Sequence, residues 1–353
     1  MHHIPRYFFG ALIACVVTLN AQAVQFSGIV SFGDSLSDLG NTYNTLGSDG
    51  SYELAGYNSS YYDVGRWSNG PVWVERLNNR LGLSPLQLND GNDLFGTDFA
   101  YGGSTSGVGY EYDFLSNLQT QVSDYRSLLT ASITGMPNVS TTLFTVWSGG
   151  NDIIYLVSDG TAITPAQIAS NISTAITSLY DAGGRFFLVP NLPPLGDKPS
   201  YVNNPSEHDE ANAFVREYNP LLSQTLASLS QDLPDVTIIP FDVYALFNDV
   251  LANPGNYNLT NVTDSAYVAD SNAPNGGYVE PNPNQYLFWD GTHPTLVGHE
   301  IIGDGAYAAL GDTLSIPEPS TVGVIVLAAI ALSVGYARRR IASRFQHAES
   351  PSR

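Results

Sequence analysis

The sequence predicts an α/β protein in which helices cover both faces of one mainly parallel sheet. Four short apolar segments, each ending in a polar or glycine- and proline-rich turn, have the length and composition of buried strands. Helical stretches separate the later strands, and strands separated in this way form parallel βαβ units. The chain between its two end segments has no internal repeat and no long linker, so one large domain is expected.

The expected strands are residues 29–32, 143–147, 186–189 and 236–241. The clearest helix signal precedes the third strand, where Thr164 is a candidate N-cap, Pro165 takes the first helical position and Gln167 completes a capping box. That helix should run to Ala182, just before two glycines, and another is expected over residues 211–229. In such a sheet, functional residues gather at the carboxyl edge, where the strands end.

Residues 1–23 have the pattern of a signal peptide. A basic residue, Arg6, precedes a mostly apolar run, and the A-Q-A triplet at 21–23 fits the small-x-small rule for cleavage. The mature chain is then expected to begin at Val24. The alternative is a lipoprotein cleavage box ending at Cys15, but the apolar run continues beyond this cysteine, where a mature lipoprotein turns polar.

Near the other end, a P-E-P motif at residues 317–319 precedes an apolar stretch over 321–337 and an arginine cluster at 338–340. The stretch is just long enough to span a bilayer, with the arginines on the cytoplasmic side. This order over residues 316–345 resembles the PEP-CTERM sorting signal of Gram-negative bacteria, which implies processing by an exosortase. A plain single-pass anchor is the alternative. Either interpretation places the body outside the inner membrane, in the cell envelope or beyond it.

The body between these segments, residues 24–315, is acidic and contains no cysteine. The whole chain has 33 Asp and Glu against 13 Lys and Arg, a formal net charge of −20. Such a charge repels polyanions, so nucleic acid is not expected as a partner. The only cysteine, Cys15, falls in the predicted signal peptide. Disulfides, a thiolate nucleophile and cysteine-based metal sites are therefore excluded from the body.

The run VSFGDSLSDLGN at residues 30–41 places Ser35 directly after the first strand, at the carboxyl edge of the sheet. A helix N-terminus is expected just behind it. Unpaired N–H groups and a partial positive charge at such an N-terminus favour a developing oxyanion, which makes Ser35 a candidate nucleophile. From this turn alone, an N-cap role for Asp34 or Ser35 is the better explanation.

A serine nucleophile needs a base, and elimination among the six histidines favours His293. Three histidines lie in the two terminal segments, His208 lies in a hydrophilic run at a helix start, and His299 lies in a helix where a surface or packing role is expected. His293 stands three residues after Asp290, whose carboxylate can accept the imidazole N–H and fix its tautomer. An Asp-x-x-His pair can also be a turn or half a metal site, but the sequence offers no convincing further ligands.

Two loops offer hydrogen-bond donors for an oxyanion. Gly103, in the run DFAYGGST, allows the backbone to approach a ligand closely. Asn151 follows the strand that ends at Trp147, so its side-chain amide should face the same sheet edge. Taken separately, each loop has the composition of an ordinary glycine turn.

Together these blocks resemble the GDSL, or SGNH, hydrolase family, from about Phe32 to the helix after His293. The G-x-S-x-G pattern of the larger α/β-hydrolase class is absent around Ser35, since its turn reads G-D-S-L-S. The family's first, second, third and fifth blocks are matched by G-D-S-L at 33–36, Gly103, G-N-D at 150–152 and D-G-T-H at 290–293.

The resemblance implies a flavodoxin-like three-layer α/β/α sandwich that uses no metal and no cofactor. It assigns a catalytic triad of Ser35, Asp290 and His293. It also assigns an oxyanion hole formed by the N–H groups of Ser35 and Gly103 and the side chain of Asn151. One departure is Asp98, where the family has Asn, and we expect it to affect the support of the Gly103 loop and not the reaction.

The implied function is a secreted or envelope-associated serine esterase or lipase that cleaves carboxylic esters through an acyl-enzyme. Residues 37–41, 191–199 and 247–259 resemble the branch labelled phospholipase, lecithinase or haemolysin. The expected partners are an ester substrate, signal peptidase and an exosortase. Alternatives on the same fold are an esterase acting on acylated polysaccharide and an acyltransferase. A non-catalytic matrix protein is a further alternative, against which the intact blocks argue.

Overall fold

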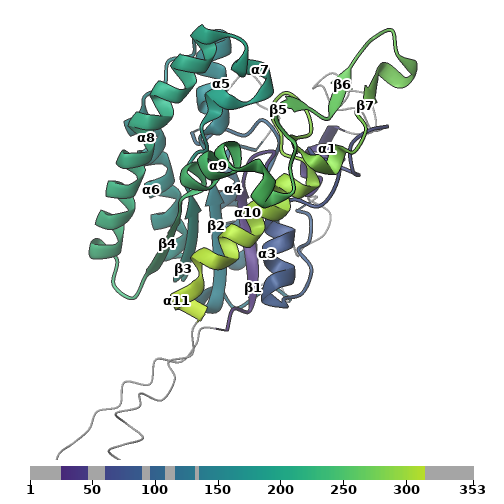
Figure 1. Cartoon of the computed structure of the whole chain (residues 1–353). Coiled ribbons are helices and arrows are strands. Elements are labelled where there is room, and N and C mark those ends of the chain that lie inside the picture. The colour runs from purple at the N-terminus through teal and green to yellow at the C-terminus, as the bar shows by residue number, and fades with distance from the viewer. Residues whose placement is uncertain (1–24, 47–59, 90–95, 108–115, 132–134, 315–353) are drawn as a thin grey trace, which may run out of the picture. The chain divides into compact units, whose positions relative to one another are not determined.

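The computed structural model describes residues 25–46, 60–89, 96–107, 116–131 and 135–314 (Figure 1). The segment Gln25–Asp312 forms one compact unit. The predicted signal peptide at 1–23 and sorting signal at 316–345, with its apolar stretch, lie outside the described residues. Within the described part of the chain, no helix combines the length and apolarity needed to cross a membrane.

Four parallel strands form the central sheet in the order β1-β2-β3-β4. They begin and end within one residue of the predicted strands, and every residue of β1 and β2 is buried. Strands buried on both faces carry near-continuous apolar runs, which is why they could be recognised from the sequence. The strands are β1 (Gly28–Gly33), β2 (Thr142–Trp147), β3 (Phe186–Pro190) and β4 (Thr237–Phe241).

A short extended segment at residues 97–99 lies along the outer side of β1. The Ser31 N–H donates to the Thr97 carbonyl and the Phe99 N–H donates to the Ser31 carbonyl, both at 2.8 Å. This pairing is parallel, through a bridge between Ser31 and Asp98. The loop that follows residue 99, which contains Gly103, therefore leaves the sheet at the same edge as the Ser35 turn.

Helices cover both faces of the sheet, and Figure 1 shows the two groups on opposite sides of β1 to β4. On one face α6 packs against both α4 and α8, and on the other α3 packs against α10. The predicted three-layer α/β/α sandwich with a mainly parallel sheet is thus confirmed. The helices are α1 (Asn41–Leu46), α3 (Trp73–Leu81), α4 (Leu118–Thr130), α5 (Gly150–Asp159), α6 (Pro165–Asp181), α7 (Pro199–Val202), α8 (Pro205–Asp232), α9 (Val243–Ala252), α10 (Leu296–Ala309) and α11 (Gly311–Leu314).

Helix α6 has the capping box expected from the sequence. The Gln167 N–H donates to the Thr164 hydroxyl at 3.2 Å, and the Thr164 N–H donates to the Gln167 side chain at 3.0 Å. Helix α8 begins six residues earlier than the predicted start at 211, because Asn204 accepts from the Ser206 N–H and Pro205 takes the first helical position. It also continues to Asp232, and Pro220 lies within it.

The chain after α9 forms two small strand pairs beside the main sheet. The pairs are β5 (Asn261–Ser265) with β8 (Tyr286–Phe288), which are parallel, and β6 (Tyr267–Ala269) with β7 (Gly277–Val279), which are antiparallel. Directly after β8, the Trp289 N–H donates to the His293 carbonyl at 2.7 Å. This bond closes the turn that contains Asp290 and His293.

Candidate active site

Ser35 lies in a tight turn directly after β1 and is buried. The N–H groups of Ser37 and Asp38 both donate to the Asp34 carbonyl, at 2.9 and 3.1 Å. The expectation of a helix N-terminus just behind Ser35 is wrong beyond this single turn, because α1 begins only at Asn41. The helix whose N-terminus lies nearest to the candidate oxyanion residues is α5, which begins at Gly150.

Asp38 and Gly40 explain why the helix starts late. The Asp38 carboxylate accepts from the N–H groups of Gly40 and Asn41, at 2.8 and 2.7 Å. It therefore occupies the donors that would otherwise extend a helix backwards from α1. Gly40 has a φ of 137°, which no helical residue can adopt. The same carboxylate accepts from the Gly102 N–H at 3.0 Å, and so ties the serine turn to the glycine loop.

The structure brings Ser35, His293 and Asp290 into one hydrogen-bonded row. The Ser35 Oγ lies 2.9 Å from His293 Nε2, although the two residues are 258 positions apart. On the other side of the ring, His293 Nδ1 lies 2.7 Å from Asp290 Oδ2. With a proton on Nδ1, the imidazole offers an unprotonated Nε2 to the serine hydroxyl, which is the arrangement that allows proton abstraction.

Asp290 is held in its charged form by four hydrogen bonds. Burial alone would raise its pKa, but the charge of His293 and the hydrogen bonds from His293 and Tyr62 lower the pKa to about 2. Its Oδ1 accepts from the N–H groups of Thr292 and His293, at 2.8 and 2.7 Å. Its Oδ2 accepts from the Tyr62 hydroxyl at 2.6 Å in addition to His293. The Asp290 carboxylate is thus ionised over the whole pH range in which a histidine titrates, and its orientation is fixed.

Asn151, in the first turn of α5, and Gly103, in the glycine loop, lie in two segments that are bonded to each other. The Asn151 side-chain amide donates one N–H to the Ser104 carbonyl at 2.9 Å, and an amide has a second N–H to offer. The Tyr155 hydroxyl of α5 donates to the Gly103 carbonyl at 3.3 Å. Gly103 has a φ of 79°, a left-handed conformation that favours glycine. Ser35 and Asn151 line the same small pocket.

Two buried side chains fasten this glycine loop to its surroundings. Gln121 of α4 bonds both the N–H and the C=O of Gly33, at 2.9 and 2.8 Å, and also reaches the Ser104 hydroxyl at 3.0 Å. Asp152 accepts from the N–H and the hydroxyl of Ser106, both at 2.8 Å. The end of β1 and the loop with the candidate oxyanion donors are therefore fixed relative to each other.

Asp98, where the resemblance led us to expect Asn, is fully buried against the serine turn. Its carboxylate accepts from the N–H groups of Leu39 and Ala100, at 2.9 and 3.2 Å, and from the Asn41 amide at 3.1 Å. Leu39 lies between the serine turn and α1, Asn41 is the first residue of α1, and Ala100 lies where the glycine loop begins. Asp98 thus supports the chain between Ser35 and α1 as well as the start of the Gly103 loop.

Asp34 is a buried carboxyl group beside the candidate nucleophile. Burial raises its pKa to about 7, although the Leu36 N–H donates to it at 3.0 Å. The group is consequently neutral in mildly acidic solution and becomes charged only as the pH rises through about 7. In its neutral form it places no negative charge beside the pocket that Ser35 and Asn151 line.

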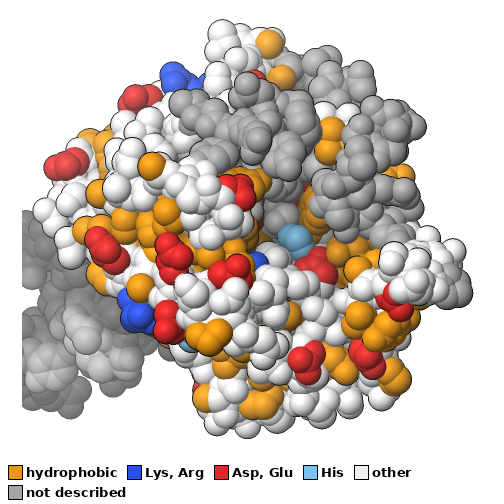
Figure 2. Space-filling view, turned by 90° about the horizontal axis from the view of Figure 1, so that it is seen from above, with side chains coloured by type: hydrophobic (Ala, Val, Ile, Leu, Met, Phe, Trp, Pro, Cys, Tyr) orange, Lys and Arg blue, Asp and Glu red, His pale blue; other side chains and the backbone are white. Residues whose placement is uncertain are grey.

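Two cavities adjoin this row of residues. A groove of about 690 Å³ is bordered by Asp290 and His293, and a small pocket of about 50 Å³ is bordered by Ser35 and Asn151. Figure 2 shows a hollow on this face with a histidine side chain at its bottom and acidic side chains beside it. The reacting groups therefore lie where a ligand can reach them from solvent.

The arrangement of the blocks is matched by a family model, "GDSL-like Lipase/Acylhydrolase", over residues 29–306. This range spans most of the chain and includes every candidate residue of the site. The protein belongs to this family. It is a carboxylic ester hydrolase.

The enzyme is similar to curated proteins of Arabidopsis thaliana. One GDSL esterase/lipase of this plant is 28% identical, and the match covers 80% of this chain and 89% of the relative. A second is 26% identical, with 83% and 84% covered. Among solved structures, a member of the lipolytic protein G-D-S-L family from Veillonella parvula is 14% identical with a TM-score of 0.41, covering 80% of this chain and 96% of that one.

The other two described histidines of the enzyme lie away from Ser35. His208, in α8, is partly exposed and contacts Asp197 and Asp209, whose hydrogen bonds raise its pKa. His299, in α10, is buried and accepts from the Trp73 N–H at 3.2 Å. Burial lowers the pKa of His299 to about 3, so it acts as a neutral packing group. No group of three or more potential metal-binding side chains occurs among the residues that the structure describes.

Tyr62 and Trp67, which the sequence patterns did not indicate, contact the candidate triad of the enzyme. The Trp67 ring lies against the His293 ring with centroids 5.3 Å apart. A Cβ atom at Gly102 would lie 2.3 Å from Trp67 Nε1, so glycine is required there for the indole to fit. Tyr62 and Trp67 lie in the irregular loop of residues 60–72, directly before α3, and their partners Asp290 and His293 are more than 200 residues away. No sequence signal of the kind used above identifies them.

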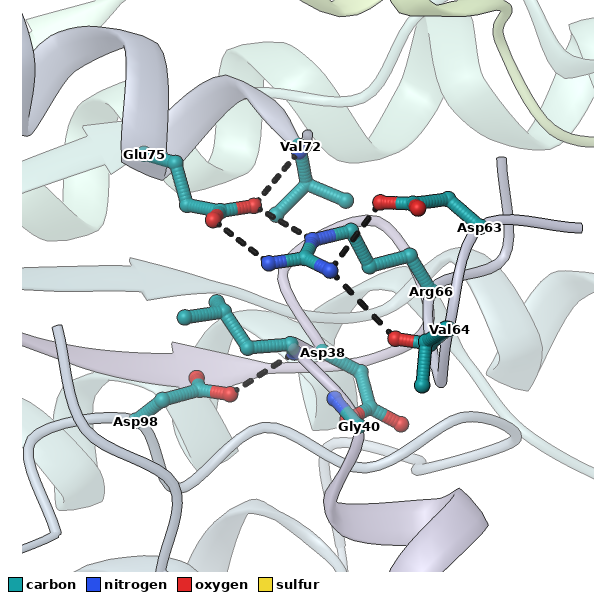
Figure 3. A network of polar contacts seen from close by, with 9 residues as sticks. Asp38, Gly40, Asp63, Val64, Arg66, Val72, Glu75 and Asp98 are labelled. Carbon is teal, nitrogen blue, oxygen red and sulfur yellow. Dashed lines mark hydrogen bonds and ion pairs between the residues drawn. The ribbon is translucent and has the colours of Figure 1, made fainter. Parts of the chain in front are cut away.

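An ion-pair network holds this loop in place (Figure 3). Arg66 donates to both carboxylate oxygens of Glu75, at 2.8 and 2.7 Å, and to Asp63 at 3.0 Å. Glu75 also accepts from the Val72 N–H at 2.9 Å, which fixes it to the start of α3. Because Arg66 stands between Tyr62 and Trp67, the network anchors both aromatic residues to the helix layer.

We expect Tyr62→Phe to reduce kcat about tenfold while leaving KM nearly unchanged. The substitution removes a donor from the same oxygen that holds His293, and a hydrogen bond to a charged group contributes about 1.5–3 kcal/mol. Loss of this bond disturbs the orientation of the imidazole but not substrate binding, so part of its free energy appears as a lower kcat. Steady-state kinetics with a soluble ester, together with the melting temperature, measures the effect.

Tyr61→Phe is the matched control, because it removes the hydroxyl of the neighbouring tyrosine. That hydroxyl donates to the Gly277 carbonyl of β7, away from the triad. Its kcat should stay close to the wild-type value. Equal kcat values for the two variants would mean that Tyr62 has no part in positioning Asp290.

Proposed function

We propose that the enzyme hydrolyses carboxylic esters by nucleophilic attack of Ser35 and through an acyl-enzyme intermediate. The observation that carries this proposal is the row Ser35 Oγ to His293 Nε2 at 2.9 Å and His293 Nδ1 to Asp290 Oδ2 at 2.7 Å. A nucleophile, a base within hydrogen-bond reach, and a third group that orients the base are the requirements for this chemistry.

In the first step, His293 Nε2 takes the proton of Ser35 as its Oγ attacks the ester carbonyl. The imidazolium is stabilised by ionised Asp290, and it then gives its proton to the oxygen of the leaving alcohol. In the second step, His293 takes a proton from water, which attacks the acyl-enzyme. Collapse of this second intermediate returns the proton to Ser35 and releases the carboxylic acid.

The proposed oxyanion hole consists of the N–H groups of Ser35 and Gly103 and the side-chain amide of Asn151. Support comes from the hydrogen bonds between α5 and the glycine loop, since Asn151 bonds Ser104 and Asp152 bonds Ser106. Donors fixed before the reaction stabilise the developing charge without reorganising. The first turn of α5 adds a favourable dipole at the same place.

Residues 24–315, produced without the end segments, are expected to hydrolyse p-nitrophenyl acetate without added metal or cofactor. With excess ester, a rapid first release of nitrophenol should precede the steady rate, and a quenched sample should carry one acetyl group on Ser35. Peptide mass spectrometry locates that group. Acetyl found on another residue, or a folded sample without activity on any ester, would contradict the proposed mechanism.

We also propose that the enzyme is exported from a Gram-negative bacterium, with cleavage after residue 23 and exosortase processing of the signal at 316–345. This proposal rests on the sequence pattern alone. In a host that has the matching exosortase, the exported protein should lack the residues from about Ser320 onward. Its intact mass decides the question, since a mass that includes residues 321–353 would favour a plain membrane anchor.

A further inference from the structure

We propose that the enzyme selects short-chain acyl esters of a large, polar alcohol that carries no negative charge. The inference rests on the proposed function, because the roles of Ser35 and His293 determine which cavity receives which half of the ester. It goes further by giving each half a size and a chemistry.

The two cavities meet at Thr292, which lines both of them, and lie on different sides of the reacting groups. His293 lines the large groove, and its Nε2 must reach the oxygen of the leaving alcohol to protonate it. Ser35 and Asn151 line the small pocket, where the carbonyl carbon and the oxyanion must lie. The acyl chain is therefore assigned to the small pocket and the alcohol to the groove.

The small pocket limits the acyl chain by volume. The small pocket has about 50 Å³ of free volume against about 690 Å³ in the groove, so it favours a much smaller group. We therefore assign an acetyl to butyryl group to this pocket and expect an octanoyl chain to fit poorly. The apolar side chains that line this pocket are Leu36, Trp147, Ile154, Pro193, Pro194, Leu195, Phe247, Phe288, Pro294 and Ile302.

The wall formed by residues 193–198 is fastened on both sides, so it cannot open easily for a longer chain. Leu192 exchanges two hydrogen bonds with the Asn219 side chain, at 3.1 and 2.9 Å, and the Gly196 N–H donates to Asn212 at 2.9 Å. Lys198, which is buried, donates to the Thr292 hydroxyl at 3.2 Å and to the Ser200 hydroxyl. Its ammonium also lies over the Tyr201 ring, 3.6 Å from the centroid.

The groove is large and polar, whereas the pocket is small and mainly apolar. Its volume of about 690 Å³ exceeds that of the pocket more than tenfold, and its lining combines hydroxyl groups with the carboxylates of Asp264 and Glu280. The described lining residues of the groove include no Lys or Arg. A phosphate, sulfate or carboxylate on the alcohol would be repelled there, whereas hydroxyl groups find acceptors. A neutral polyhydroxylated alcohol, such as a sugar unit of a glycan, fits both the size and the charge.

The acyl half is tested with p-nitrophenyl acetate, butyrate and octanoate below their solubility limits. We expect kcat/KM to fall at least tenfold from butyrate to octanoate. Ile154→Ala, which enlarges the pocket from its partly exposed side, should raise the octanoate-to-acetate ratio at least threefold. Val157→Ala on the same helix, outside the pocket, should leave the ratio unchanged. If the wild-type enzyme cleaved the octanoate as fast as the butyrate, the proposed preference for short acyl chains would be wrong.

The alcohol half is tested by acetate release from two soluble polymers, an acetylated neutral glucan and an acetylated alginate, at low salt. The glucan should react at least tenfold faster, and Glu280→Lys should narrow the difference. Glu217→Lys makes the same change in charge on the exposed face of α8 and should not narrow it. Equal rates on the two polymers would show that the proposed preference for an uncharged alcohol is wrong. An enzyme that cleaves no ester at all, p-nitrophenyl acetate included, would refute the proposed function itself.

Discussion

Ser35→Ala and His293→Ala are each expected to reduce the rate of ester hydrolysis by a factor of about 10⁴ or more. Either substitution removes one of the two atoms that lie 2.9 Å apart in the structure, the attacking oxygen or the nitrogen that accepts its proton. Without one, the other has no function in the reaction, and only the oxyanion donors and substrate binding remain to accelerate it. Initial rates with p-nitrophenyl acetate, corrected for the uncatalysed reaction, measure this loss.

The double variant should be scarcely slower than either single variant, since groups that act as one unit do not contribute additively. His208→Ala is the matched control. Its ring contacts two carboxylates, as a triad histidine contacts one, but its hydrogen-bond partners are Asp197, Asp209 and Asn212 and not a serine. A wild-type rate for Ser35→Ala, or a double variant slowed by the product of the two single effects, would refute a joint role.

The central sheet could be predicted from the sequence because its chemistry is local. An apolar run such as residues 143–147 is fully buried between two helix layers, and each strand ends in residues that cannot continue it. The box formed by Thr164 and Gln167 likewise specifies the start of α6 through bonds between close neighbours. A few adjacent residues determine elements of this kind, so a single sequence is enough to locate them.

The elements that were missed depend on contacts between distant residues. Helix α1 starts late because Asp38 turns its carboxylate onto the chain ahead, and the same carboxylate also binds the Gly102 N–H, 64 residues away. The small strand pair β5 and β8 forms beside the main sheet, although β5 is polar and β8 has only three residues, so neither shows a strand pattern. Tertiary context decides such cases, and local propensity cannot.

Some residues of the candidate site could likewise be predicted from local sequence, and others could not. His293 could be singled out because few histidines remained and Asp290 stands three residues before it, a relation visible in the sequence. Tyr62 could not, because its bond to Asp290 joins positions 228 apart, and one buried tyrosine among the 21 in the chain has no distinguishing mark. Lys198 is similar, since only the folded chain shows it to be buried beside Thr292.

Asn151→Ala is expected to lower kcat about a hundredfold or more while changing KM much less. The side-chain amide is fixed by its bond to the Ser104 carbonyl and has a second N–H for the substrate oxygen. That oxygen carries little charge in the bound ester and most of its charge in the transition state, so removal of the donor lowers kcat. Tyr155→Phe, which removes another bond between α5 and the glycine loop without removing a donor to the substrate, should stay close to wild type. An effect of Asn151→Ala confined to KM would make Asn151 a binding residue, and similar losses in both variants would trace the effect to loop support.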